Sequence, residues 1–195
     1  MILGLTGSIG GGKSTVREYL VSRKWFGFDA DEYCKQIWRN PDRDFLGRLE
    51  AHFGNSLYGA DGKLDKEKIA DKIFSDAGNM KKWQDLLYPA LEKEMLRIVD
   101  HCRREKINAV LEVPLLFENS YENIFDLVMT VWAPANIRSE RLTGSRQINA
   151  ADIRRRESFQ MSDDEKLEKA DIGIINNQDR NFLVMQLEKF LLSIE

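Results

Sequence analysis

Residues 7–15 constrain this chain more than any other stretch. They read Gly-Ser-Ile-Gly-Gly-Gly-Lys-Ser-Thr and match the phosphate-binding pattern G-x-x-x-x-G-K-[ST] at every fixed position. An apolar run precedes them at residues 2–6, and a pattern typical of a helix follows at residues 16–20. Because the pattern needs a strand, a loop and a helix in that order, this context favours a true phosphate site over a glycine-rich turn that happens to contain Gly-Lys-Ser.

Each residue type in this loop suits a triphosphate. Glycines let the backbone adopt positive φ, so that successive amide N–H groups point toward one anion, and the next helix presents its positive end to the same anion. The Lys13 ammonium is expected to reach the β and γ phosphates, and the Ser14 hydroxyl is expected to ligate Mg²⁺. The loop residues predicted to hold the nucleotide are Gly10, Gly11, Gly12, Lys13, Ser14 and Thr15.

Short apolar runs alternate with helical patterns along the chain, which indicates an α/β fold. The predicted strands cover residues 2–6, 25–28, 108–113, 126–132 and 172–175. With right-handed crossovers they form a five-stranded parallel sheet in a three-layer domain, the architecture of P-loop kinases. We expect a single domain over residues 1–195.

Residues 42–105 contain no convincing strand, and their apolar residues recur at helical spacing. This length is sufficient for a helical lobe that faces the phosphate loop, although the helices could instead only cover the sheet. Pro89 is expected to break or kink the last and longest helix, because proline lacks an N–H donor and disfavours helical geometry at Tyr88.

The composition indicates a globular protein with a sizeable core, since 43% of the 195 residues are hydrophobic and 31% are charged. The formal net charge of −3 argues against nucleic acid or a membrane surface as a general partner. No run approaches the roughly 20 apolar residues of a membrane span. Cys34 and Cys102 belong to no metal-binding pattern. We expect a cytoplasmic protein with reduced cysteines, either a monomer or a weak homo-oligomer.

Arginines, without a lysine, are concentrated between residues 136 and 160. They are Arg138, Arg141, Arg146, Arg154, Arg155 and Arg156. Arginine makes planar, multi-donor contacts to phosphate oxygens, so residues 136–160 are predicted to form a lid over the nucleotide. We assign Arg141, Arg146 and Arg156 to the phosphates. For the other three arginines a solvated helix face is an equal alternative.

Polar residues follow three of the predicted strands, at the edge where an open parallel sheet binds its ligands. Asp29 and Asp31 follow the second strand, and one of them can accept a proton from an attacking hydroxyl group while it orients water on Mg²⁺. A helix N-cap is the alternative for either aspartate. Glu112 ends the third strand and is predicted to hold the metal through water. Asn176 follows the fifth strand and is assigned to the nucleotide.

At these residues the chain resembles the dephospho-CoA kinase family. The matching segments follow the family's order from residue 1 to about residue 177. They include Gly7 to Thr15, Asp29-Ala30-Asp31, His52-Phe53-Gly54, Asp61-Gly62, Ile73-Phe74, Val113-Pro114-Leu115-Leu116-Phe117-Glu118, Gln160-Met161 and Ala170-Asp171. The phosphate loop is common to many kinases and ATPases, whereas the Asp-Ala-Asp and Val-Pro-Leu-Leu-Phe-Glu segments are much more specific.

The resemblance implies transfer of the γ-phosphoryl group of ATP to the 3′-hydroxyl of dephospho-CoA, with Mg²⁺, giving CoA and ADP. It implies that Asp31 is the catalytic base, that Lys13 and Arg146 act on the phosphates, and that residues 42–105 form the CoA-binding lobe. The residues implied in acceptor binding are Asp29, Asp31, Leu87, Pro114, Leu115, Leu116, Phe117 and Glu118.

Four residues depart from the family's pattern. Tyr88 stands before Pro89 where the family usually has histidine, Gln147 follows the lid arginine where aspartate is usual, and Arg23-Lys24 replaces a Leu-Gly turn. The Tyr88 substitution concerns how the insert holds the acceptor and leaves the phosphate chemistry untouched.

Two other functions fit parts of the sequence. One is a kinase of the same architecture that acts on a nucleoside, a nucleoside monophosphate or shikimate. The other is a switch GTPase or a nucleotide-sensing binding module. Against the second, the chain has no Asn-Lys-x-Asp for guanine and no Asp-x-x-Gly after a strand, and an arginine-rich lid has no use in a sensor.

Overall fold

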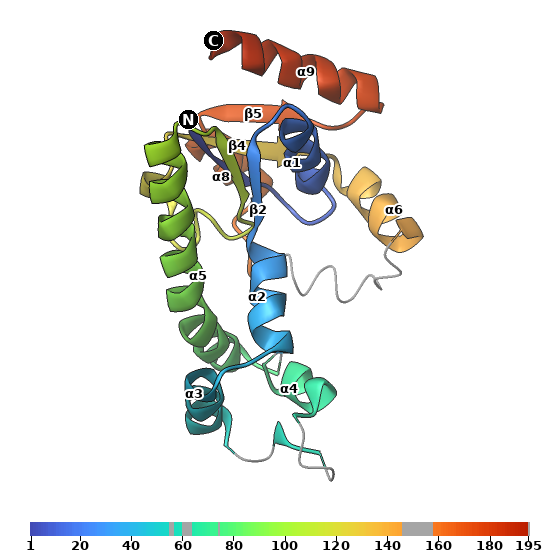
Figure 1. Ribbon diagram of the computed structural model, residues 1–195. Coiled ribbons are helices and arrows are strands. Elements are labelled where there is room, and N and C mark those ends of the chain that lie inside the picture. Colours follow the sequence, from blue (N-terminus) through green and yellow to red (C-terminus); the bar gives the residue numbers. More distant parts are fainter. Residues whose placement is uncertain (55–56, 60–63, 74, 146–157, 195) are drawn as a thin grey trace. The chain divides into compact units, whose positions relative to one another are not determined.

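The chain divides into two compact units, one made of Met1–Asp31 with Arg97–Glu195 and the other of Glu32–Leu96 (Figure 1). The computed structural model describes residues 1–54, 57–59, 64–73, 75–145 and 158–194. The second unit starts and ends about ten residues before the limits predicted for the insert, residues 42–105. Within the described residues, no helix has the length and apolar character that crossing a membrane requires.

Five parallel strands form the sheet of the first unit, in the order β2-β3-β1-β4-β5. They are β1 (Ile2–Thr6), β2 (Phe26–Asp29), β3 (Ala109–Glu112), β4 (Leu127–Trp132) and β5 (Ile172–Ile175). The α/β fold with a five-stranded parallel sheet is confirmed, and every strand overlaps its predicted range. The central strand β1 and its neighbour β3 are buried throughout, which is why their sequences are nearly continuous apolar runs.

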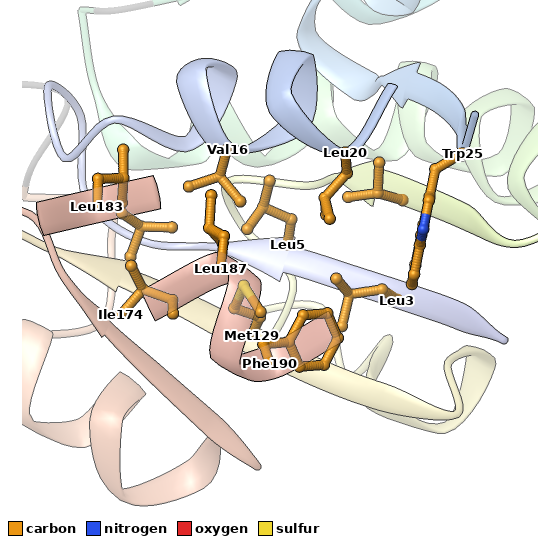
Figure 2. Packing of buried hydrophobic residues seen from close by; sticks show 12 residues of the cluster. Leu3, Leu5, Val16, Leu20, Trp25, Met129, Ile174, Leu183, Leu187 and Phe190 are labelled. Carbon is orange, nitrogen blue, oxygen red and sulfur yellow. The ribbon is translucent and has the colours of Figure 1, made fainter. Parts of the chain in front are cut away.

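One face of the sheet packs on helices α1 and α9 (Figure 2). The helices of the first unit described here are α1 (Lys13–Ser22), α6 (Ala135–Ser145), α8 (Asp163–Lys169) and α9 (Arg180–Ser193), with a 3₁₀ turn, η2 (Glu122–Ile124). Leu3 and Leu5 of β1 meet buried side chains of both covering helices, which are Val16, Leu20, Leu183, Leu187 and Phe190. A fully buried leucine contributes about 1.5–3 kcal/mol by leaving water. This core therefore fixes α1 and, with it, the loop that precedes α1.

Gly4 faces the opposite side of the sheet from Leu3 and Leu5, since side chains alternate along a strand. A Cβ atom added at Gly4 would lie 2.7 Å from Phe125 and 2.8 Å from Leu116. The segment that follows β3 is therefore packed directly onto the second face of the sheet.

The second unit is helical, as predicted. It holds α3 (Arg43–Phe53) and α4 (Lys66–Ile73), together with parts of α2 (Ala30–Arg39) and α5 (Ala77–Glu105), which both extend across the boundary between the units. Its aromatic centre is Trp83, whose ring centroid lies 5.3 Å from that of Trp38 and 6.2 Å from that of Phe45. The β-type pairing found among its described residues is one isolated bridge, Tyr58 to Leu64.

Pro89 does not break α5, so the break, one of the two outcomes expected from the sequence, does not occur. The helix runs from Ala77 to Glu105 with Pro89 inside it. A proline in a helix interior costs about 3 kcal/mol, but Leu86, Leu87 and Leu91 on either side are all at least 96% buried. Their burial offsets the lost hydrogen bond, so tertiary packing overrides the local preference.

Candidate active site

The phosphate loop joins β1 to α1 and follows a path that only glycine permits. Gly7, Gly10 and Gly12 have φ angles of 133°, 78° and 104°, a region that disfavours residues with a side chain. Space is also limiting, because a Cβ atom at Gly12 would lie 2.1 Å from Asn176 Nδ2 and one at Gly7 would lie 2.3 Å from the carbonyl oxygen of Val131. Backbone conformation and close contact therefore both explain the glycine pattern.

Lys13 begins α1, and the loop itself holds its ammonium group. Lys13 Nζ donates hydrogen bonds to the carbonyl oxygens of Gly7 at 2.8 Å and Ser8 at 3.1 Å, and the residue is 7% exposed. A buried charge needs such compensation. Ser14 and Thr15 follow in the first turn of α1, with Ser14 half-buried and Thr15 exposed.

Two carboxylates meet at the edge of the sheet where β2 and β3 end. Asp29 is paired with Glu112 in the register of these strands, and Glu112 is also paired with Leu5 near the end of β1. Ser14 Oγ donates a hydrogen bond to Glu112 Oε1 at 3.2 Å. The two residues that were predicted to serve Mg²⁺, Ser14 and Glu112, therefore lie side by side next to the phosphate loop.

Arg17 joins these carboxylates and was not singled out from the sequence. Its Nε donates to Glu112 Oε2 at 2.9 Å, and its Nη2 donates to Asp29 Oδ2 at 3.2 Å. The signal that could have indicated it is spacing, because Arg17 follows Lys13 by four residues and so lies on the same face of α1, one turn later.

The structure separates the two aspartates that follow the second predicted strand. Asp29 is the last residue of β2 and is half-buried, whereas Asp31 is the second residue of α2 and is exposed. Asp29 forms an ion pair with Arg17. Asp31 is therefore the more accessible of the two carboxylates.

Asn176 directly follows β5 and is hydrogen-bonded to the phosphate loop. Its Nδ2 donates to the Gly11 carbonyl oxygen at 2.9 Å, and the residue is 7% exposed. Arg141 of α6 donates from Nη2 to the carbonyl oxygen of Asn176 at 3.1 Å and to its Oδ1 at 3.3 Å. Two residues assigned to the nucleotide from the sequence, Asn176 and Arg141, are thus brought together at the loop.

A second network links the loop to α6, which lies within the predicted lid, and to α8, which begins just after it. The Ser8 hydroxyl donates to Asp163, the first residue of α8. Arg138 of α6 donates from Nη1 to Asp163 Oδ2 at 2.6 Å and to the Ala133 carbonyl oxygen at 2.8 Å. Since Arg138 is 9% exposed, a solvated helix face is the wrong interpretation for it.

The remaining lid arginines lie outside the described residues. They are Arg146, Arg154, Arg155 and Arg156. Of the residues predicted to form the lid, 136–160, those described are 136–145, which lie in α6, and 158–160.

The segment predicted to line the acceptor site contains both core and accessible residues. Leu116 is 0% and Phe117 is 7% exposed, whereas Pro114 and Leu115 are half-buried. In the second unit, Leu87 is 4% exposed and belongs to the hydrophobic cluster there. Leu116, Phe117 and Leu87 are thus packed inside the protein, and Pro114 and Leu115 are the more accessible members of the predicted acceptor set.

Glu118 is engaged by other parts of the chain. Its Oε1 accepts a hydrogen bond from the Met161 amide at 2.6 Å and lies 3.0 Å from Lys166 Nζ. Lys166, in α8, is 0% exposed and also donates to the Pro114 carbonyl oxygen at 3.1 Å. The buried ammonium group of Lys166 therefore connects α8 to Pro114 and Glu118, the two ends of this segment.

Replacing Lys166 with methionine is expected to lower the free energy of unfolding by about 3 kcal/mol, because removal of one partner of a buried ion pair leaves the other uncompensated. The measurement is urea unfolding of the nucleotide-free protein. Lys169→Met, at an exposed position of the same helix, is the matched control and is expected to stay within about 0.5 kcal/mol of wild type. Adding Glu118→Gln to Lys166→Met should recover part of the loss. Equal stability of the Lys166 and Lys169 variants would contradict a buried ion pair.

Comparison with known proteins assigns the chain to a family. A family model described as dephospho-CoA kinase matches residues 1–181. The chain belongs to the dephospho-CoA kinase family. Among curated members, a dephospho-CoA kinase of Streptococcus pyogenes serotype M3 is 30% identical over 194 residues, which cover 100% of this chain and 98% of that protein. A dephospho-CoA kinase of Corynebacterium diphtheriae is 34% identical over 188 residues, with 93% and 91% covered.

Solved structures agree with this assignment at the level of the fold. A crystal structure of a Thermus thermophilus protein matches with a TM-score of 0.81 and 28% identity over 100% of this chain and 98% of that one. A dephospho-CoA kinase from Campylobacter jejuni has a TM-score of 0.71 and 23% identity, with 99% and 96% covered. A shikimate kinase from Acinetobacter baumannii has a TM-score of 0.57 and 14% identity, with 100% and 94% covered. The sheet is therefore of the P-loop kinase type.

Membership of the dephospho-CoA kinase family makes the chain a nucleotide-binding phosphotransferase of coenzyme A biosynthesis. It decides against the switch GTPase, the nucleotide sensor and the kinases for other small acceptors, which the sequence left open as alternatives.

Proposed function

We propose that this chain transfers the γ-phosphoryl group of ATP to the 3′-hydroxyl of dephospho-CoA, giving CoA and ADP, with Lys13 and Asp31 as the central catalytic residues. The family's activity is the ATP-dependent phosphorylation of dephospho-CoA to CoA. The observation that carries the assignment of roles is the meeting of the phosphate loop, Ser14, Glu112 and Asp29 at one edge of the sheet.

The donor side of the site is the loop and the start of α1. Amides from Gly10 to Thr15 bind the phosphate oxygens, and the Lys13 ammonium exchanges its two loop carbonyls for the β and γ phosphates. Asn176 donates a hydrogen bond to the Gly11 carbonyl oxygen, and Arg141 in turn donates to Asn176. The positive end of α1 adds to the attraction, because its first N–H groups have no partner inside the helix.

The residues present fit Mg²⁺. A hydroxyl oxygen and a carboxylate oxygen, from Ser14 and Glu112, lie 3.2 Å apart beside the loop, and hard oxygen donors are what Mg²⁺ prefers. No cluster of three or more histidine, cysteine, aspartate or glutamate side chains that could hold a metal occurs among the described residues. This suits an ion bound mainly by phosphates and water, with Ser14 as a direct ligand and Glu112 acting through water. When bound, the ion neutralises charge that develops on the phosphoryl oxygens.

Asp31 is the proposed general base. It accepts the proton of the 3′-hydroxyl as that oxygen attacks the γ-phosphorus in line with the departing ADP oxygen, so the O–P bond to ADP breaks as the O–P bond to the acceptor forms. Its exposure at the start of α2 leaves it accessible to a substrate. Asp29 and the accessible residues Pro114 and Leu115 are proposed neighbours of the acceptor, together with the lobe predicted over residues 42–105.

The lid completes the proposal. Residues 136–160 are proposed to close over the nucleotide, with Arg146 and Arg156 on the phosphates, so that water is excluded and wasteful hydrolysis of ATP is limited. The ion pair of Arg138 with Asp163 supports this role, because it joins a residue of the proposed lid to a side chain that also accepts a hydrogen bond from Ser8 of the phosphate loop.

We also propose that the enzyme is cytoplasmic and is either a monomer or a weak homo-oligomer. In the described chain Cys34 and Cys102 are not joined in a disulfide, as expected for a reducing compartment.

The decisive experiment is incubation of the purified protein with MgATP and dephospho-CoA, with detection of CoA by mass. ADP release is measured in parallel with adenosine, AMP and shikimate as acceptors. We expect CoA and ADP in equal amounts, and ADP release with the other acceptors near the rate without acceptor. Absence of CoA, or faster ADP release with another acceptor, would overturn the proposal.

A further inference from the structure

Arg17 forms ion pairs with both carboxylates at the edge of the sheet, Asp29 and Glu112. Its guanidinium donates to Glu112 at 2.9 Å and to Asp29 at 3.2 Å. The side chains of Arg17, Asp29 and Glu112 are 22%, 26% and 7% exposed. These contacts are thus mostly shielded from water and salt, unlike ion pairs on an open surface.

The contact divides the oxygens of Glu112 between two partners. Oε2 accepts from Arg17 Nε, and Oε1 accepts from Ser14 Oγ at 3.2 Å. A carboxylate that is held at both oxygens has one orientation, whereas one held at a single oxygen can rotate. Arg17 therefore determines that Oε1 of Glu112 is directed at Ser14.

The same contact reduces repulsion between two negative groups. Asp29 and Glu112 are paired in the register of β2 and β3, and like charges directly opposite each other on neighbouring strands are destabilising. The planar guanidinium can donate to both at once, through Nε and Nη2, which an ammonium group on a single nitrogen does less well.

The local sequence makes room for this arginine. A Cβ atom added at Gly27 of β2 would lie 3.7 Å from Arg17 Cγ and 2.5 Å from Val21 Cγ2. Because Gly27 has no side chain, Val21 and the aliphatic part of Arg17 can pack directly on β2. Val21 follows Arg17 by one turn of α1.

We propose that Arg17 is a positioning residue for phosphoryl transfer, which fixes Glu112 for its role toward Mg²⁺ and keeps Asp29 in place beside it. The inference rests on the proposed function and adds to it a residue that acts through two others. Partners that orient metal-associated carboxylates typically contribute about 10–100-fold to metal affinity or activity.

A purely structural role for Arg17 would give a different result. Helix α1 is already held by Val16 and Leu20, which are both 0% exposed in the core. Loss of the guanidinium should therefore affect the free energy of unfolding far less than it affects the response to Mg²⁺.

The test compares Arg17→Met and Arg17→Lys with Arg23→Met, a matched control at an arginine just beyond the end of α1 that pairs with Glu188 instead. Calorimetry measures ADP binding with Mg²⁺ and with a chelator, which gives the gain in affinity due to Mg²⁺ without any turnover. We expect Arg17→Met to lose about 10-fold or more of this gain. Arg17→Lys should be intermediate, and Arg23→Met should match wild type.

Steady-state kinetics and a double-mutant cycle complete the test. Arg17→Met should lower kcat for CoA formation by about 10–100-fold and leave the KM for dephospho-CoA within about 3-fold. In a Glu112→Gln background, Arg17→Met should lower kcat by no more than about 3-fold, because Arg17 is expected to act through Glu112. The inference would be overturned if Arg17→Met and Arg23→Met had the same gain in ADP affinity from Mg²⁺ and the same kcat. It would also be overturned if Arg17→Met lowered kcat as much in the Glu112→Gln background as in wild type. Wild-type protein that forms no CoA would instead contradict the proposed function, and the ADP measurement would still test Arg17.

Discussion

Replacing Lys13 with methionine is expected to lower kcat for CoA formation by about 10³-fold or more, the scale of a lost cation at a transferring phosphoryl group. Methionine keeps most of the apolar stem in a site that is 7% exposed, so the substitution removes the charge and little packing. The carbonyl oxygens of Gly7 and Ser8 then lose their shared donor. The measurement is the single-turnover rate with both substrates saturating.

The control for Lys13→Met is Lys189→Met, at an exposed position of α9. It removes a lysine from the same unit without contact to the loop and should keep the wild-type rate. Urea unfolding of both variants checks that the loop variant is folded. A Lys13→Met rate within about 10-fold of wild type, in a folded protein, would show that the ammonium does not act on the phosphoryl group in the transition state.

The sheet and the loop could be predicted because their signals are local. Gly7, Gly10 and Gly12 occupy φ angles that other residues avoid, so the backbone itself requires the pattern in the sequence. Central parallel strands are buried on both faces and so read as apolar runs. The register of the strands then brings Asp29 and Glu112 together, as expected for residues at the carboxyl ends of neighbouring strands.

Local signals failed where packing or register decided the outcome. Pro89 remains inside α5 because buried leucines on both sides stabilise the helix. Asp29 and Asp31 were both predicted to follow the second strand, but Asp29 is the last residue of β2 and α2 begins directly after it, at Ala30. The complete burial of Leu116 against the sheet was also not indicated by the sequence, because it depends on which face of the sheet the segment after β3 covers.

Ion pairs between residues far apart in the chain could not be predicted from the sequence, because they depend on strand order and on where helices pack. Arg17 meets Glu112 only because β3 lies between β2 and β1, and Lys166 meets Glu118 only because α8 returns to the segment after β3. A charged residue on a helix is usually solvated. Strand order, which no local pattern specifies, decides which of the charges find a buried partner.

The largest effect expected on the acceptor side is that of Asp31→Asn. Asparagine has nearly the same shape but cannot take the proton of the attacking hydroxyl, so kcat should fall by about 10²–10⁴-fold, the usual contribution of a general base. The affinity for ADP should be unchanged, because the loop and Ser14 are untouched. The measurements are single-turnover formation of CoA and calorimetric binding of ADP with Mg²⁺.

Two comparison variants make the assignment of the base testable. Glu32→Gln neutralises the next residue of α2, which forms ion pairs with Arg39 and Lys35 of the same helix, and should leave kcat within about 2-fold of wild type. Asp29→Asn removes the partner of Arg17 and should give the smaller loss of a positioning defect, about 10–100-fold. Because an orienting carboxylate and a proton acceptor differ in this way, a larger loss for Asp29→Asn than for Asp31→Asn would transfer the role of base to Asp29.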